Sequence, residues 1–315
     1  MRHHFILLFL AAIFLVYGCE KNIEIDVPPT APQIVVEGNI ETGQPPIVLL
    51  SRTNGFFEPV SAESIAASYI SDADVRVNGI SLDQVCVSDL PEELRTTVSL
   101  ALGIPLDQLS ALDVCAYIGF DNTLTGQENT SYKLEVDVDG EYISAVTHIP
   151  GIVQPDSVWF RLWADSPRFG FLYSSVTDPD TLNNAYRVFT RRLESQNNDN
   201  PADRVFYAPL QSAFIDEFFN GQTAEVTLTR GMPSNSTRPT DQGESEGFFE
   251  SGDRVILKFC STDEPTYQFF RTFDAQQGTN GSPFSAPSNI ISNIDGGLGI
   301  WAGYAAVYDT LYAIP

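Results

Sequence analysis

The sequence SYKLEVDVDGEYISAVT, residues 131–147, decides the fold class of this chain. Polar and apolar residues alternate along 131–138 and again along 141–147, which is the pattern of a strand with one buried face. Asp139-Gly140 lies between the two runs and is a two-residue hairpin signal, because both turn positions need a positive φ. The stretch therefore predicts an antiparallel β-hairpin.

More strands are predicted on the N-terminal side of this hairpin. Residues 33–40 (QIVVEGNI) and 45–51 (PPIVLLS) are two β-rich runs joined by a short turn, so we expect them to pair. Residues 73–79 alternate in the same way and end in Asn-Gly. Short strands at this spacing are typical of a sandwich.

A helical insertion interrupts this series of strands. Cap residues, an early proline and early acidic residues at 88–94 indicate the start of a helix, and Gly103 ends it. We therefore predict an immunoglobulin-like β-sandwich over residues 33–150, with a helical insertion at 88–115.

The sequence beyond the proline-bounded segment 150–155 predicts a second β-rich domain over residues 151–315. All 3 tryptophans lie in it, and we expect its aromatic residues to form core, not a ligand platform. Residues 266–275 predict one packed helix, and the domain as a whole is expected to be sandwich or barrel-like. The predicted strands are 157–163, 170–177, 184–193, 203–208, 224–229, 253–260 and 300–314.

The first 32 residues predict export and attachment to a membrane. A basic start, the apolar run 5–17 and Gly18 predict a signal peptide over residues 1–18. The run is shorter than the roughly 20 apolar residues of a spanning helix. Cys19 directly after Gly18 resembles a bacterial lipobox, so we expect Cys19 to be lipidated; a plain signal peptide is the alternative. Residues 19–32 then form a proline-rich tether.

The charge balance limits the partners of the chain. It carries 41 acidic and 17 basic residues, for a net charge of −24. Such a surface repels phosphates, so we expect no nucleic-acid partner. It also repels anionic lipid head groups, so membrane attachment has to come from the acyl chains, of which two or three anchor stably.

Candidate catalytic and metal-binding residues are few. Two of the 3 histidines lie in the predicted signal peptide, and for His148, in a strand-like run before a proline, we expect a structural role. This count excludes a histidine-rich zinc site, and no nucleophile-elbow motif is present. Acidic clusters at 178–180 and 197–200 lack the EF-hand pattern, so we expect solvated loops. We therefore predict no catalytic residues, no metal and no cofactor.

Three further cysteines are Cys86, Cys115 and Cys260. An exported protein meets an oxidising compartment, and Cys86 and Cys115 flank the helical insertion. They are a candidate disulfide pair, with Cys260 then a buried free thiol. The sequence leaves the connectivity open.

Ordered landmarks run along most of the chain. They are CE (19–20), IVVEG (34–38), PDSV (155–158), NNAYR (183–187), FIDEFFNG (214–221), GDRV (252–255), PF (283–284), PSNI (287–290) and SNIDGGLGIWAGY (292–304).

This set resembles the Bacteroidota lipoproteins grouped as domain of unknown function 4249. The resemblance implies an outer-membrane lipoprotein, on the periplasmic face or the cell surface, of a kind often encoded beside TonB-dependent receptors, and it implies no catalytic residues. We therefore expect an accessory binding component that works with a TonB-dependent receptor in nutrient capture or uptake, with the ligand open. A structural or adhesive envelope module is the alternative, and a hydrolase is the weakest of the three.

Overall fold

The hairpin at residues 131–147 forms as predicted. Strands β7 (Thr130–Val138) and β8 (Glu141–Ile149) pair antiparallel over their whole length. Asp139 and Gly140 have φ values of 52° and 81°, which is the left-handed geometry of a tight hairpin turn. Along β7 the buried residues alternate with exposed or half-buried ones, so one face of the hairpin covers a core.

A computed structural model describes residues 31–55, 61–102, 106, 109, 114–121, 123–164, 166–194, 202–203, 205–231, 247–279 and 289–315. The predicted signal peptide (1–18), Cys19 and the tether up to residue 30 lie outside the described residues. Within these ranges, no helix has both the length and the apolar character needed to cross a membrane.

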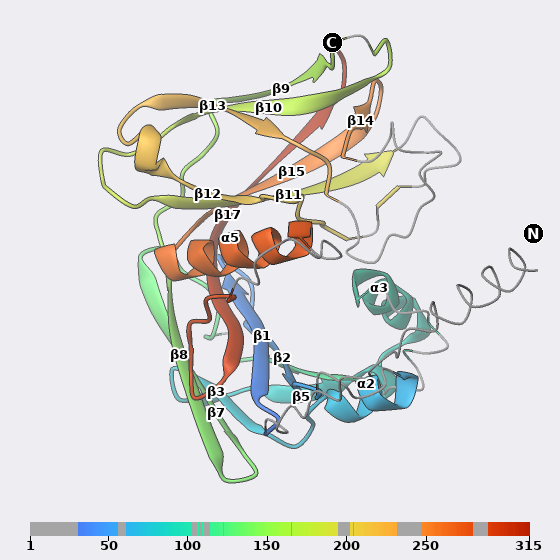
Figure 1. Cartoon of the computed structure of the whole chain (residues 1–315), viewed down its shortest axis with the longest axis vertical. Helices are drawn as coiled ribbons and strands as arrows, with labels where there is room; N and C mark the ends of the chain where they lie inside the picture. Colours follow the sequence, from blue (N-terminus) through green and yellow to red (C-terminus); the bar gives the residue numbers. More distant parts are fainter. Residues whose placement is uncertain are drawn as a thin grey trace, which may run out of the picture. The chain divides into compact units, whose positions relative to one another are not determined.

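The strands form three sheets, drawn in Figure 1. The central sheet has the order β12 (Ala213–Ile215), β11 (Ala185–Glu194), β15 (Arg254–Thr262), β17 (Leu298–Tyr312), β1 (Ile34–Glu41), β2 (Ile47–Arg52), β6 (Cys115–Ile118) and β5 (Asp83–Cys86). The second sheet has the order β13 (Thr223–Leu228), β10 (Phe169–Thr177) and β14 (Phe249–Glu250), and β9 (Ser157–Leu162) also pairs with β10. The third has the order β16 (Ile294–Asp295), β8, β7, β3 (Asp74–Val77) and β4 (Ile80–Ser81).

The long strand β17 connects the strands of the two halves of the sequence. Its first half pairs in parallel with β1, from Val35 opposite Leu298 to Glu41 opposite Tyr304. Its second half pairs antiparallel with β15. The central sheet therefore continues across the boundary predicted at residues 150 and 151, and residues 32–315 form one compact unit.

Each smaller sheet packs against its own part of the central sheet. The third sheet and the β1–β2 end enclose a core that includes Val36, Leu134 and Trp301. The second sheet and the β11–β15 end enclose another core, which includes Leu172 and Phe259. The fold is therefore mostly β with sandwich packing, as predicted, and the sheets of the described residues are open rather than closed into a barrel.

Helices occupy the remaining face and the insertion. Helix α5 (Glu264–Thr279) confirms the helix predicted at 266–275, and its phenylalanines pack on the central sheet opposite the two sandwich cores. Figure 1 shows α5 lying across β17. The insertion contains the 3₁₀ turn η1 (Val87–Asp89) and helix α3 (Glu92–Leu102), which confirms the predicted helix.

Several local predictions need correction. Residues 203–208 form no strand in their described part; Tyr207 makes an isolated bridge to Thr190 instead. Helix α2 (Ala62–Ser68) was not predicted, although Ser61 and Ser64 form a reciprocal capping box. Trp301 is core as expected, but Trp163 is 54% exposed, because it follows β9 on the outer side of the second sheet.

Cys86 and Cys115 lie opposite each other on β5 and β6 and form a disulfide. It closes the loop that carries α3, with a sequence separation of 29. Replacing both cysteines by serine should lower the free energy of unfolding by about 2–4 kcal/mol, since the open chain gains loop entropy. Chemical denaturation of both proteins measures the loss, with reduced wild type as the control. Peptide mapping without reductant that finds both thiols free would contradict the assignment.

Candidate functional site

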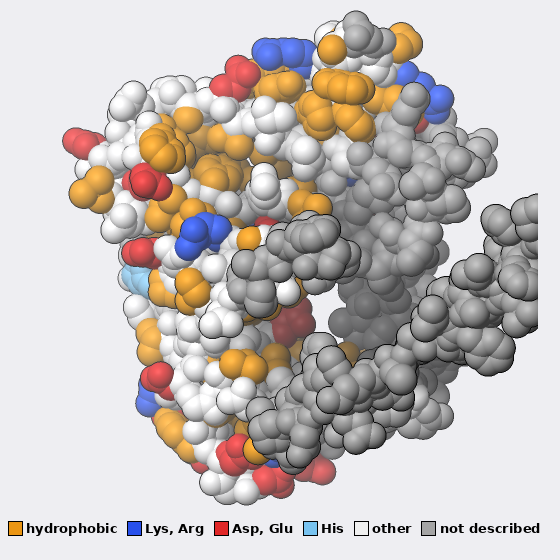
Figure 2. Space-filling view, viewed as in Figure 1, with side chains coloured by type: hydrophobic (Ala, Val, Ile, Leu, Met, Phe, Trp, Pro, Cys, Tyr) orange, Lys and Arg blue, Asp and Glu red, His pale blue; other side chains and the backbone are white. Residues whose placement is uncertain are grey.

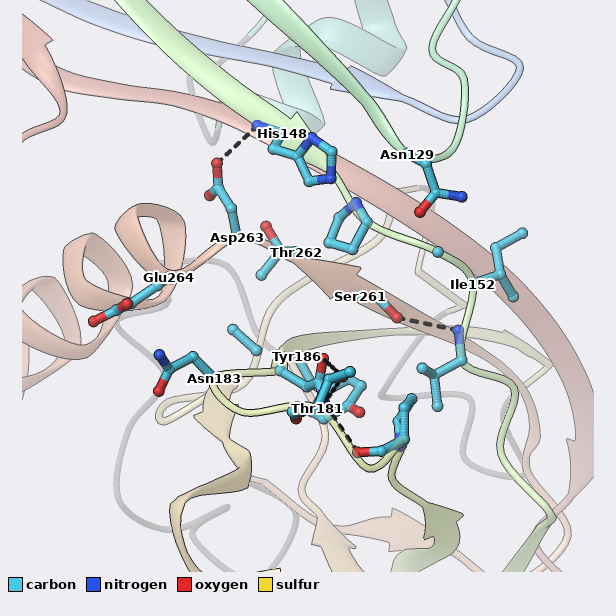
Figure 3. Close-up of a pocket in the computed structure, with 16 residues that line it drawn as sticks. Asn129, His148, Ile152, Thr181, Asn183, Tyr186, Ser261, Thr262, Asp263 and Glu264 are labelled. Atoms are coloured by element: carbon cyan, nitrogen blue, oxygen red, sulfur yellow. Dashed lines mark hydrogen bonds between the residues drawn. The ribbon is translucent and has the colours of Figure 1, made fainter. Parts of the chain in front are cut away.

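A pocket of about 460 Å³ lies where the two sandwiches adjoin. Figure 3 shows Asn129 and His148 on one side of it and Thr181, Asn183 and Tyr186 on the other. The start of α5 and the connector from β8 to β9 complete the wall. The lining residues are Asn129, His148, Pro150, Gly151, Ile152, Val153, Pro179, Thr181, Asn183, Asn184, Ala185, Tyr186, Ser261, Thr262, Asp263 and Glu264.

Asp263 fixes the wall where β8 ends and α5 begins. Its Oδ2 accepts hydrogen bonds from the backbone N–H of His148 at 2.8 Å and from the Thr147 hydroxyl at 2.9 Å. Its Oδ1 accepts from the backbone N–H of Thr266 at 3.1 Å and so caps α5. The Asp263 carboxylate therefore connects the last residues of β8 to the start of α5. Both of its oxygens are used in these structural hydrogen bonds, so the carboxylate has a structural role without a ligand.

Two side chains hold the connector from β8 to β9 through hydrogen bonds to its backbone. The Ser261 hydroxyl accepts from the N–H of Val153 at 3.2 Å, and the Glu128 carboxylate accepts from the N–H of Ile152 at 2.9 Å. These bonds satisfy backbone donors that a strand would otherwise pair. The connector is therefore held in place without belonging to any sheet.

Two buried aspartates hold the opposite wall. Asp216 accepts from the backbone N–H groups of Asn183 and Asn184 at 3.1 and 3.0 Å. Asp178 accepts from the Tyr186 hydroxyl and from the N–H of Gly221. Burial, and then the bond to Asp178, raise the pKa of Tyr186. Asp178 is therefore a buried structural acid and not part of a solvated loop as predicted, whereas Pro179 and Asp180 are exposed loop residues. The cluster at 197–200 lies outside the described residues.

Three polar side chains of the pocket remain available to a ligand. The amides of Asn129 and Asn183 and the carboxylate of Glu264 make no side-chain hydrogen bond or ion pair with other described residues. Two amides and one carboxylate supply both donors and acceptors to a small polar molecule. Polar groups of this kind, few and not bonded to other residues, are those that orient a ligand in known small-molecule sites.

The predicted structural role of His148 fits its position. Its ring Nδ1 is 3.1 Å from the Ser131 hydroxyl, across the β7–β8 pair, and its backbone is held by Asp263. Cys260 is buried under α5 as a free thiol. Burial raises the pKa of the Cys260 thiol to about 12, so it stays protonated and unreactive at neutral pH.

A second polar group lies on the α5 side of the central sheet. Lys258 forms an ion pair with Glu41, and the Tyr308 hydroxyl donates to the same carboxylate. Burial, followed by this bond, raises the pKa of Tyr308. The charges satisfy one another here, so we regard the group as a link between β1, β15 and β17 rather than as a binding site.

Fold and pocket together define a class: a β-sandwich protein with a shared central sheet and a small polar pocket between its two halves. Among the residues with described positions, no group of three or more histidine, cysteine or acidic side chains is placed to hold a metal ion.

The chain belongs to the family described as Domain of unknown function (DUF4249), whose model matches residues 20–308. The family predicted from the landmark motifs is thereby confirmed. A comparison with curated proteins gave no match.

Proposed function

We propose that this protein is an outer-membrane lipoprotein that binds a nutrient and assists a TonB-dependent receptor in its capture or uptake. The observation that carries the proposal is the start of the sequence, where the apolar run 5–17 ends in Gly18-Cys19. A thiol at that position is the acceptor for a diacylglycerol group in proteins with a lipobox.

The pocket supports the binding part of this proposal. Its unbonded groups, Asn129, Asn183 and Glu264, come from three separate parts of the chain. The aspartates around them are occupied in holding the walls. A pre-formed wall with a few free polar groups suits recognition of a small ligand.

The charge of the chain supports the anchoring part. A net charge of −24 gives the protein no electrostatic attraction to an anionic membrane surface. Acyl chains on Cys19 supply the attachment by burial of methylene groups, each worth about 0.8 kcal/mol. The tether up to residue 32 then leads into β1.

Replacing Cys19 by alanine should abolish membrane attachment. We expect the tagged chain to move from the membrane pellet to the soluble fraction, or to accumulate with its signal peptide uncleaved, because the lipid acceptor is gone. Cell fractionation and intact-mass analysis measure both outcomes. Asn22→Ala, which changes a neighbouring tether residue and keeps the thiol, is the control. A Cys19→Ala protein that stays in the membrane fraction after cleavage would sink the anchoring proposal.

Uptake measurements test the transport role separately. Deletion of the gene, with the neighbouring receptor intact, should reduce uptake of the nutrient that the receptor imports, and the wild-type gene should restore it. Normal uptake of every nutrient tested, with a membrane-attached protein, would favour a structural or adhesive role instead.

A further inference from the structure

Two of the three tryptophans lie on the outer face of the second sheet. On β9, Phe160 faces the core, so its neighbour Trp159 faces outward. On β10, Leu172 faces the core, so its neighbour Tyr173 faces outward. Trp163 is 54% exposed. Figure 2 shows hydrophobic side chains gathered at the top of the view, near β9 and β10 of Figure 1, with basic side chains beside them.

The rings on this face form two neighbouring groups on the paired strands β9 and β10. In the first, Trp159 and Tyr173 are register partners with centroids 5.9 Å apart and planes inclined by 18°. In the second, Phe248 has centroid distances of 5.3 Å to Trp163 and 4.7 Å to Phe171. We call these five residues the aromatic platform.

The sandwich does not need the aromatic platform for its core. The inner face of the same sheet already supplies Phe160, Leu172 and Val176 to that core. The outer face of a two-layer sandwich is ordinarily polar. A contiguous apolar patch on a solvated face is characteristic of a binding surface.

The edges of the platform carry charged side chains, but their positive and negative charges balance. Arg161 lies 4.5 Å over the Tyr173 ring and 3.6 Å from the Glu225 carboxylate. Arg168, which lies over the neighbouring Phe169 ring, pairs with Glu250, whose side chain is only 10% exposed. Each arginine is matched by one acid, whereas the whole chain has a net charge of −24. A neutral ligand is therefore favoured over an ionic one at this face.

The platform lies far from the point where the tether enters the fold. Residue 32 leads into β1, which pairs with the Leu298 end of β17. The second sheet packs near the other end, against Val307 and Leu311. β17 has 15 residues, which corresponds to roughly 50 Å at the usual rise per residue. The start of β1 and the platform therefore lie toward opposite ends of β17.

We propose that the aromatic platform binds a neutral glycan. Pyranose rings have apolar C–H faces that stack on aromatic rings such as those of Trp159 and Trp163. Their hydroxyl groups accept from arginine and donate to glutamate, which Arg161 and Glu225 at the edge provide. The proposal goes beyond the proposed function, because it concerns a second binding surface that is separate from the pocket.

Native gels that contain a soluble neutral polysaccharide test this assignment. The full chain, purified in mild detergent, is run in gels with and without dextran, laminarin, mannan or hydroxyethyl cellulose. We expect at least one of them to slow wild type. Trp163→Ala should weaken the binding about tenfold, because one stacked ring is lost. Phe218→Ala removes an aromatic side chain that is 89% exposed outside the platform and should migrate like wild type.

Two further measurements keep the test decisive. The retardation should be unchanged at about 0.5 M NaCl, which screens ionic contacts, and Trp163→Ala should keep the wild-type melting temperature. The proposal is overturned if none of the four polysaccharides slows wild type, or if Trp163→Ala is slowed as strongly as wild type. Retardation that salt abolishes points to an ionic ligand and also overturns it. A wild-type dimer that Trp163→Ala converts to a monomer would assign the platform to self-association. None of these results alters the membrane attachment through Cys19, so failure here is distinguishable from failure of the proposed function.

Discussion

Replacing Trp301 by alanine should lower the free energy of unfolding by about 3–5 kcal/mol, the range for removing a large buried aromatic side chain. Trp301 is fully buried in the first sandwich core. Its indole N–H donates to the backbone carbonyl of Tyr132 at 2.9 Å and so ties β17 to the hairpin strand β7. The loss therefore combines a cavity with an unpaired carbonyl. Urea denaturation of both proteins measures it.

Gly38 provides a control that isolates the packing of this indole. Gly38 is the register partner of Trp301, and a Cβ added there would lie 2.9 Å from the indole ring. Gly38→Ala should therefore lower the free energy of unfolding of the wild type. It should lower that of Trp301→Ala by less, because the indole ring is absent there. Equal costs of Gly38→Ala in the two backgrounds would show that the indole does not press on β1.

The backbone of Trp301 explains one of the landmark motifs. The side-chain amide of Asn293 donates to the Trp301 carbonyl at 2.8 Å and accepts from its N–H at 2.9 Å. The motif at 292–304 therefore brings its own first residues alongside its last strand. The sequence marks this motif as a landmark. Its structural role depends on the hydrogen bonds between Asn293 and Trp301, which the sequence alone does not predict.

Local patterns predicted the elements whose signals are local. The 131–147 hairpin and helices α3 and α5 were predicted because alternation, turn residues and caps lie within each segment. Strand β16 has two residues and exists because it pairs with Ala145 and Ser144, about 150 positions earlier, so no periodicity marks it. No local pattern predicts the parallel pairing of β1 with β17 either, because it joins the two ends of the described chain.

The pocket was harder to predict than the fold, because its walls come from separated segments. Asn183 and Asn184 were noticed in a landmark motif, but no pattern placed them opposite His148. Asp263 was missed although it carried a usable signal, an aspartate followed by Glu264 and a proline, which indicates a capped helix start. Asp178 was expected in solvent because acids usually are exposed; its burial depends on the hydroxyl of Tyr186.

Replacing Asp203 by alanine should cost about 3–5 kcal/mol of unfolding free energy, because it leaves the charge of Arg230 buried and unpaired. The two side chains are 2.8 Å apart, with 6% of Asp203 and 4% of Arg230 exposed. The other oxygen of Asp203 accepts from the backbone N–H of Arg192 at 2.8 Å. That N–H loses its partner in the same substitution.

A double replacement distinguishes an unpaired charge from lost packing. Asp203→Asn keeps the shape of the side chain, and Arg230→Met removes the guanidinium while it keeps most of the apolar stem. If the buried charge dominates, Asp203→Asn with Arg230→Met should be more stable than Asp203→Ala by about 2 kcal/mol or more, since no ion is then left without a partner. Thermal and urea unfolding of wild type, Asp203→Ala and the double variant give the comparison. A double variant as unstable as Asp203→Ala would contradict this explanation. The loss of stability would then come from the lost packing and hydrogen bonds of the two side chains, and not from an unpaired charge.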